Sequence, residues 1–329
     1  MGLLEVQHDM QFTAAPGARA DGMPDKHFSL SKIQWPRPPE IFCGPLLLLR
    51  ESPKLDREVR GAIYATTDVA YSESFVGLSA LNKPQLAQLM DLIYVVSYSD
   101  LFLYYQLLTS PKFGVERDSS LQRDLLEFPL VREETLSSLA WQQLRKVAGR
   151  LREGTIDWVE LDELVFELHG LTAADGQLVR DTLEMELPFT DISKAATAPT
   201  ARAERLTFCD SIRKLLAPFF APDQPMRVTE FLERPIDGWV FIEVGAPQPG
   251  SEGFVPTVDL ANLVEFADSY WSSRIVIKID GRTIYGLLDQ RRYWTQTEAR
   301  NLALGWLQVR AALTPEPRLK RSQAGASST

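Results

Sequence analysis

Residue types that build most metal and redox sites are scarce in this sequence. Its 329 residues include two cysteines and three histidines. Cys43 and Cys209 are far apart and form no CxxC pair, and the histidines are scattered, so a zinc site is not expected. Nothing marks the chain as secreted, which disfavours a disulfide between the two cysteines. We therefore expect no metal and no other cofactor.

Motifs of common catalytic centres are also missing. No glycine cluster follows a predicted strand, as a P-loop or a dinucleotide-binding fold requires. Neither a GxSxG elbow nor an HExxH helix occurs. An N6-adenine methyltransferase needs an Asn/Asp-Pro-Pro-aromatic loop, whereas the Arg-Pro-Pro-Glu at residues 37–40 lacks both the amide and the aromatic ring. We predict that the chain is not an enzyme.

One pair of carboxylates imitates a nuclease site. Asp237 and Glu243 lie in the stretch IDGWVFIEVG, and paired carboxylates with a nearby lysine can hold a catalytic metal ion. The position expected for that lysine, two residues after Glu243, is occupied by Gly245. An acidic turn that leads into an alternating strand is the favoured interpretation, and a divergent metal-dependent nuclease is a minor alternative.

Long apolar runs and a surplus of basic charge are absent too. Runs such as residues 45–49 are far shorter than the ~20 apolar residues of a membrane span. The first residues do not have the pattern of a signal peptide, so we expect a cytoplasmic protein without membrane contact. Lys and Arg number 35 against 44 Asp and Glu, a net charge of −9. This balance disfavours general attraction to phosphate and suits docking on a basic partner.

What the sequence does contain is a globular share of apolar residues, 45%, which suffices for two modest domains. In the first half, short apolar or alternating runs predict strands, and apolar residues at helical spacing predict helices. The predicted strands cover residues 44–50, 62–67 and 70–78, with an extended piece over 125–130. The predicted helices cover residues 84–96, 99–109, 133–154, 157–169 and 173–184.

The second half alternates differently, with strands in pairs between two helices. Helices are predicted over residues 204–216 and 297–312, and antiparallel pairs over 226–232 with 238–244 and over 274–279 with 283–288. Asp280-Gly281 between the last two strands is a strong hairpin signal. The predicted class is therefore α+β. Its parts are an arm (1–40), a strand-rich domain (41–131), a helical spacer (132–190), a linker (191–203), a smaller α+β domain (204–313) and a disordered tail (314–329).

Three segments, taken in order, resemble one family. They are IFCGPLLLLR at residues 41–50, residues 63–79 with YSESFVGLS, and residues 92–130 with SPKFGVERD and LLEFPL. Together they resemble the target-recognition region of N6-adenine DNA methyltransferases of restriction-modification and phage-defence systems. LDELVFELHGLT at residues 161–172 is similar to the helical stretch that follows this region, with His169 at a position where an aromatic residue is common.

The resemblance covers about residues 41–190, and residues 290–295 show a weaker similarity to the same family. In the family, a strand-rich recognition domain follows the catalytic domain and leads into a spacer helix. The catalytic domain is missing from this chain, so the resemblance implies that a methyltransferase or another effector is a separate polypeptide. It also implies that double-stranded DNA is a partner.

Recognition of DNA needs side chains that reach base edges and cations that contact phosphate. The candidates for these contacts stand in or beside the predicted loops, and for each an ordinary exposed surface is the alternative interpretation. For Arg291 and Arg292 that alternative is the start of a helix, where the neighbouring aromatic residues fill the core while the arginines stay in solvent. The candidates are Arg50, Lys54, Arg57, Arg60, Thr66, Thr67, Tyr71, Ser72, Lys112, Arg117, Arg291 and Arg292.

Two main hypotheses follow. The first is a non-catalytic DNA-recognition (specificity) subunit of a methylation-linked restriction or phage-defence complex, which supplies DNA contacts to a separate effector. The second is a protein-only scaffold of such a complex with no DNA contact, and the net charge of −9 favours it.

Overall fold

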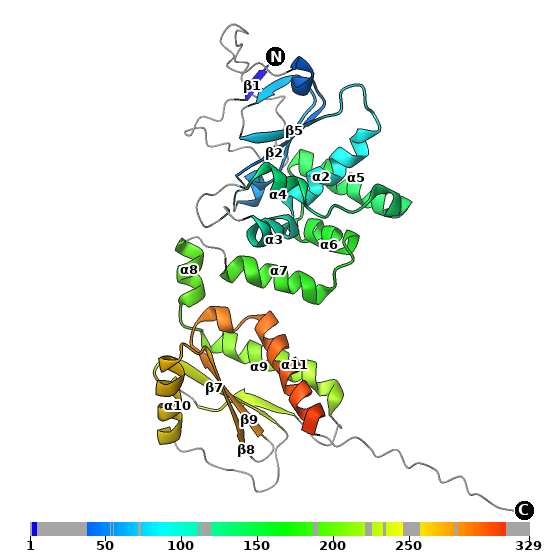
Figure 1. The fold of residues 1–329 in the computed structure, drawn as a ribbon. Helices are drawn as coiled ribbons and strands as arrows, with labels where there is room; N and C mark the ends of the chain where they lie inside the picture. The colour runs from blue at the N-terminus through cyan, green and yellow to red at the C-terminus, as the bar shows by residue number, and fades with distance from the viewer. Residues whose placement is uncertain are drawn as a thin grey trace, which may run out of the picture. The chain divides into compact units, whose positions relative to one another are not determined.

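The computed structural model describes residues 2–4, 38–52, 54, 56–71, 74–110, 113, 120–186, 190–220, 226–232, 235–245, 257–279 and 282–313. The fold is mixed α+β, as predicted. The chain divides into two compact units, Met1–Lys194 (unit 1) and Ala195–Thr329 (unit 2). Figure 1 labels the elements of both.

Unit 1 contains a three-stranded antiparallel sheet of order β3-β2-β5. The central strand β2 (Leu46–Arg50) pairs with β3 (Ile63–Ala65) and with β5 (Phe75–Ser79). The stretch 70–78, predicted as one strand, is divided between β4 (Val69–Tyr71) and β5, with a turn at Ser74. Alternating polarity continues through that turn, so the pattern does not reveal it. β4 pairs in parallel with β1 (Gly2–Leu4), which lies within the predicted arm.

The remainder of unit 1 is mainly helical. Short 3-10 turns cover Pro39–Phe42 (η3) and Glu133–Thr135 (η4). Within the described part of the chain, no single helix is long and apolar enough to cross a membrane. The helices α2 (Leu86–Tyr98) and α3 (Asp100–Thr109) reach that length and apolar character only together, and the chain bends by 74° between them. The helices are α1 (Arg57–Arg60), α2 (Leu86–Tyr98), α3 (Asp100–Thr109), α4 (Gln122–Leu126), α5 (Ser138–Glu153), α6 (Trp158–Leu168) and α7 (Ala173–Met185). The boundary between the two units falls within α8 (Thr190–Thr197).

Capping residues place the helix ends as predicted. The Ser99 hydroxyl accepts a hydrogen bond from the Phe102 N–H and begins α3. Thr172 and Asp175 form a capping box at the start of α7. Gly170, with φ of +67°, ends the turn after α6 in a conformation that favours glycine.

Two segments differ from the prediction. Residues 125–130 were expected to be extended, but α4 occupies the start of this segment, because the Asp124 carboxylate accepts a hydrogen bond from the Leu121 N–H and stabilises a first helical turn. The expected linker over 191–203 contains most of α8 and the start of α9. Its alanines favour a helix even though few large apolar residues are present.

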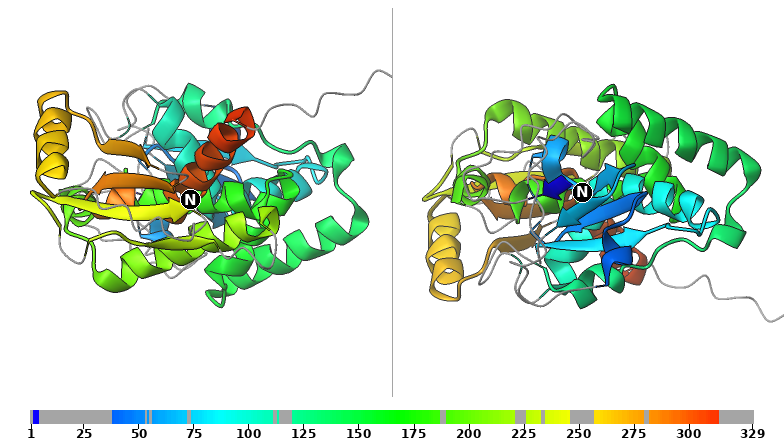
Figure 2. Two further views of the ribbon diagram at one scale, coloured as in Figure 1. Left: turned by 90° about the horizontal axis from the view of Figure 1, so that it is seen from below. Right: turned by 90° about the horizontal axis from the view of Figure 1, so that it is seen from above.

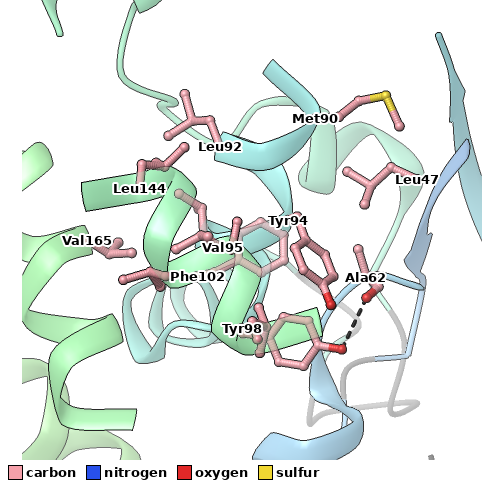
Figure 3. Close-up of a cluster of buried hydrophobic side chains, with 14 of the residues drawn as sticks. Leu47, Ala62, Met90, Leu92, Tyr94, Val95, Tyr98, Phe102, Leu144 and Val165 are labelled. Carbon is pink, nitrogen blue, oxygen red and sulfur yellow. Dashed lines mark hydrogen bonds between the residues drawn. The ribbon is translucent and has the colours of Figure 1, made fainter. Parts of the chain in front are cut away.

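The core of unit 1 forms where α2 packs on β2 and on α5 and α6 (Figure 3). Two side chains of α2 bind both backbone groups of one residue before β3. The Ala62 N–H donates to the Ser97 hydroxyl (2.9 Å), and the Tyr98 hydroxyl donates to the Ala62 carbonyl (3.1 Å). Gly61 lies so close that an added Cβ would stand 2.2 Å from the Tyr98 ring, so only glycine fits there.

Unit 2 is built on a four-stranded antiparallel sheet of order β6-β7-β9-β8. Both predicted strand pairs are confirmed, and β7 joins β9 to unite them. The β8–β9 ladder extends to Ile279 opposite Arg282, as the predicted two-residue hairpin requires; Asp280 and Gly281 lie outside the described residues. The strands are β6 (Arg227–Glu230), β7 (Trp239–Gly245), β8 (Arg274–Ile279) and β9 (Arg282–Leu288).

Helices cover both faces of this sheet (Figure 1 and Figure 2). Val240 and Ile242 of β7 pack with α9 (Arg202–Leu216) and α11 (Gln296–Leu313). Trp239 and Phe241 point to the other face and pack with α10 (Thr257–Ser269). β7 is consequently buried on both sides along its whole length. The sequence interpretation did not include α10, although Leu260, Val264 and Ala267 recur at helical spacing. Two 3-10 turns, η5 (Ala217–Phe219) and η6 (Arg291–Tyr293), complete the unit.

Candidate functional site

Three chain segments meet at Glu51, immediately after β2. The Glu51 N–H donates to the Ser74 carbonyl (3.1 Å), and the Ser120 N–H donates to the Glu51 carbonyl (2.7 Å). Ser120 also donates its hydroxyl to the buried Gln106 side chain (2.9 Å). We call Glu51, Ser74 and Ser120 the Glu51 junction. It attaches three places to one end of the sheet: the start of the β2–α1 loop, the residue before β5, and the end of the connection between α3 and α4.

Several predicted DNA contacts belong to the segments that reach this junction. Lys54 is exposed in the β2–α1 loop. Ser72 precedes Ser74, and Lys112 and Arg117 precede Ser120; these three predicted residues lie outside the described residues. The junction thus brings together the described ends of segments that are distant in sequence, which the sequence interpretation did not foresee.

Arg50, the last residue of β2, is half-buried beside the junction. Its guanidinium carbon lies 5.3 Å from the centre of the Phe75 ring, the residue opposite it on β5. Burial lowers the pKa of Arg50, and Tyr98 opposes this shift. Cation–π contact with Phe75 accounts for its position better than contact with a phosphate does.

The arginines of α1 bind carboxylates inside unit 1. Arg60 is only 7% exposed. Its Nη1 lies 2.7 Å from Oδ1 of Asp100, and its Nε donates to the Lys54 carbonyl (3.1 Å). Arg57 forms ion pairs with Asp100 and with Asp162, the latter at 2.6 Å. Arg57 also lies 5.9 Å from the centre of the Trp158 ring.

The two carboxylates of this network come from different helices. Asp100 begins α3, and its N–H donates to Oδ1 of Asp162 on α6 (2.8 Å). Burial raises the pKa of Asp162, the Asp100 carboxylate adds to the rise, and Arg57 opposes it. Burial lowers the pKa of Arg60, and the neighbouring Asp100 carboxylate opposes this shift. Two guanidinium and two carboxylate groups leave the network without net charge, which suits a largely buried position.

This network gives partners within unit 1 to Arg57 and Arg60, which the sequence predicts as DNA contacts. Both side chains are directed to Asp100, so they attach α1 to the helices rather than present charge to a ligand. The sequence shows them in a charged stretch next to a strand, but it does not show that α3 and α6 bring carboxylates to them. Their effect on a ligand would be indirect, because Arg60 holds the backbone of Lys54.

Other predicted contacts lie at the opposite end of the same sheet. Thr66 and Thr67 are exposed between β3 and β4, near the start of β2, since Ala65 pairs with Leu46. Tyr71 is half-buried, and its ring packs edge-on against Phe42 with centroids 5.2 Å apart. Its hydroxyl donates to the Ile41 carbonyl (3.4 Å). The predicted residues of the first domain therefore do not form one surface, and Tyr71 packs on η3.

The basic pair of unit 2 is also engaged internally. Arg291 pairs with Glu204 through Nε (3.0 Å). The Arg292 Nε donates to Gln290 (3.0 Å), and its guanidinium carbon lies 5.1 Å from the centre of the Tyr293 ring. The neighbouring Trp294 is buried in the core, where its Nε1 donates to the Leu288 carbonyl. These contacts fit the alternative interpretation, in which this segment enters a helix and its aromatic residue fills the core.

The carboxylates of the nuclease alternative do not meet. Asp237 (φ +47°) and Gly238 (φ +80°) form a tight turn closed by paired backbone bonds between Ile236 and Trp239. Glu243 is buried on β7 and pairs with Arg282 (3.4 Å). Strand geometry places the Cα of Glu243 about 13 Å from that of Trp239, too far for Asp237 and Glu243 to share one metal ion. In the described part of the chain, no cluster of three or more His, Cys, Asp or Glu residues is placed to hold a metal.

Comparison of the chain with protein-family models, with curated proteins and with solved structures finds no match.

Proposed function

We propose that this chain is a non-catalytic DNA-recognition subunit, which acts in the cytoplasm and supplies DNA contacts to a separate methyltransferase or other effector. The observation that carries the proposal is the Glu51 junction, which attaches three loop-bearing segments to one end of a sheet. Binding residues commonly stand on loops that a rigid scaffold positions. The resemblance of residues 41–190 to target-recognition regions supports the same assignment.

Three cations of the site are the proposed phosphate contacts. Lys54 is exposed and its backbone is held by Arg60, so it can meet a phosphate with little loss of backbone freedom. Lys112 and Arg117 remain phosphate contacts predicted from the sequence. Because the chain carries a net charge of −9, these few cations must act locally. We expect weak, salt-sensitive binding by the chain alone and tighter binding together with its effector.

A mobility-shift titration of duplex DNA at several salt concentrations tests the proposal. Replacement of Lys54, Lys112 and Arg117 together by Glu should remove about three phosphate contacts and reduce the slope of log affinity against log salt by about three. Lys83→Glu is the matched control. Lys83 is exposed and lies near the opposite end of the sheet, because it bonds to Ala80, which in turn bonds to Pro45 before β2.

Two results would contradict DNA recognition. One is the absence of DNA binding both by the chain alone and by the chain with a copurified effector. The other is an equal loss of affinity in the single variants Lys54→Glu and Lys83→Glu, which change the net charge by the same amount; an equal loss would reflect net charge rather than a site.

A protein-only scaffold is the second candidate. The pairing of Arg57 and Arg60 within unit 1 favours it, since it removes two cations from the predicted DNA surface. It predicts a stable complex with an effector whose DNA affinity is unchanged by Lys112→Glu and Arg117→Glu.

A further inference from the structure

The helix α10 ends in a conformation that its sequence does not favour. The Ser272 N–H donates to the Ala267 carbonyl (2.9 Å), and the Trp271 N–H donates to the Asp268 carbonyl (3.1 Å). These bonds form a Schellman-type cap, in which the residue of left-handed conformation is usually glycine. Here that residue is Trp271, with φ of +55°. A bulky side chain at such a backbone position is unfavourable, and such outliers gather at functional sites.

Packing within unit 2 does not account for this tryptophan. Trp271 is 96% exposed. Two further aromatic residues near the end of α10 are exposed as well, Tyr270 at 70% and Phe266 at 62%, and their rings lie 4.7 Å apart. We call Phe266, Tyr270 and Trp271 the α10 aromatic surface. Exposed aromatic residues that cluster in this way are typical of interaction sites rather than of an ordinary surface.

The aromatic surface stands on a firmly packed helix. The opposite side of α10 places Leu260 and Val264 in the core of unit 2, where they are almost completely buried. Asp268 accepts a hydrogen bond from Nε1 of the buried Trp239 (3.1 Å). The helix is therefore held against the sheet, and the exposed rings are offered on a rigid support, which lowers the cost of ordering them on binding.

The charges on α10 indicate what this surface binds. Every charged residue of the helix is acidic, and all three are exposed: Asp259, Glu265 and Asp268. The basic residues of the nearby strand β8 do not offset them, because Ile275 and Ile277 face α10 while Arg274 alternates to the other face, where it pairs with Glu298. Exposed rings on a helix whose charges are all acidic attract Lys and Arg side chains, by cation–π contact and by charge.

We propose that the α10 aromatic surface docks a basic segment of a partner protein, with Trp271 as the principal anchor. Apolar and cationic side chains of the partner cover the three rings, and its remaining cations are attracted by the acidic charge of α10. The acidic surroundings make nucleic acid an unsuitable occupant. The proposal does not depend on whether unit 1 binds DNA, and it assigns to unit 2 a separate task, attachment to an effector or another basic subunit.

The test uses the full chain and fluorescent peptides of defined composition. The probe is an amphipathic peptide of Lys, Arg and Leu; a peptide with Glu in place of the cations and a DNA duplex are the comparison ligands. Trp271→Gly should weaken binding of the basic peptide by at least about tenfold, as loss of an interface anchor does. Because glycine suits the left-handed conformation, the thermal midpoint of unfolding of unit 2 should not fall. Phe219→Ala, which removes an exposed aromatic residue of η5, should leave the affinity unchanged.

Several outcomes would overturn the proposal. They are unchanged peptide affinity in Trp271→Gly, a lower thermal midpoint in that variant, and either equal binding of the acidic peptide or a loss of DNA affinity in Trp271→Gly as large as its loss of peptide affinity. A fourth is a dimer of the wild-type chain in sedimentation that Trp271→Gly converts to a monomer, because the surface would then bind a second copy of the chain.

Discussion

Asp100 holds the network that joins α1 to the helices of unit 1, and replacing it by Asn tests the role assigned to that network. Its carboxylate binds Arg60 through Oδ1 at 2.7 Å and Arg57 through Oδ2. Asn at this position keeps one oxygen acceptor but removes the negative charge. The buried guanidinium of Arg60 then retains the Lys54 carbonyl as an acceptor but loses its counter-ion.

The magnitude follows from burial. Breaking a buried ion pair by removing one partner costs about 3–5 kcal/mol, because the remaining charge is uncompensated. The oxygen that Asn retains offsets about 1 kcal/mol of this cost. Asp100 also stands in the first turn of α3, where a negative charge contributes about 0.5 kcal/mol through the helix dipole. We expect Asp100→Asn to destabilise α1, α3 and α6 by about 3 kcal/mol.

Asp162→Asn is the matched control, because it changes the other carboxylate of the same network. Asn retains the oxygen that accepts from the Asp100 N–H and loses only the pair with Arg57. Burial already raises the pKa of Asp162, so its charged form is disfavoured in the folded chain. Removing that charge should cost less than about 1 kcal/mol, because Arg57 is partly exposed and keeps Asp100 as its counter-ion.

Hydrogen exchange of backbone amides reports local stability, so it shows the effect of each variant on unit 1 and on unit 2 separately. A loss of 3 kcal/mol raises the exchange rate of α3 amides by roughly a hundredfold. The amides of α9 in unit 2 serve as an internal reference and should not change. Exchange in α3 that increases equally in the two variants, or by less than about threefold in Asp100→Asn, would refute the assigned importance of the buried Arg60 pair.

Two further predictions concern other buried titratable groups. Burial lowers the pKa of His169, whose Nδ1 lies 2.7 Å from the Val165 carbonyl. The folded chain thus binds a proton less readily than the unfolded chain, so stability is complete above the unfolded pKa of about 6.5 and is lost as pH falls through it. Thermal unfolding of unit 1 should occur at a lower temperature at pH 5 than at pH 7, and the difference should shrink in His169→Phe; an unchanged difference contradicts this. Cys209 is 1% exposed in the core of unit 2, and burial raises the pKa of its thiol to about 12. In a Cys43→Ala variant, a thiol reagent should label the chain only after unfolding, and rapid labelling of the native chain would show that this core is open.

Local signals in the sequence account for much of the fold. Ser99 and Thr172 begin helices because their hydroxyls accept backbone hydrogen bonds within the same turn. The pairing of β8 with β9, predicted from a two-residue hairpin signal, also follows from neighbouring residues alone. The helical spacing of the apolar residues Leu260, Val264 and Ala267 could have predicted α10. Nothing in residues 70–78 predicts their division into two strands.

The candidate site was predictable only in part. Exposed Lys54 and the loops around it follow from a charged, turn-like stretch between strands. The roles of Arg57 and Arg60 do not, because nothing within either arginine's own turn shows that Asp100 and Asp162 will lie beside it. Charge patterning distinguishes polar from apolar segments, but it does not distinguish an ion pair in a partly buried network from a cation open to a ligand.

By itself, the sequence determined the α+β class and most helix and strand positions, because capping, turn chemistry and apolar spacing act over a few residues. Only the tertiary structure decided which distant groups meet: β7 with β9, Glu51 with Ser74 and Ser120, and the arginines of α1 with two carboxylates. It also decided that Trp271 stays in solvent while Trp239 and Trp294 are buried. These outcomes depend on how complete elements pack, and the same residue type therefore has opposite surroundings in one chain.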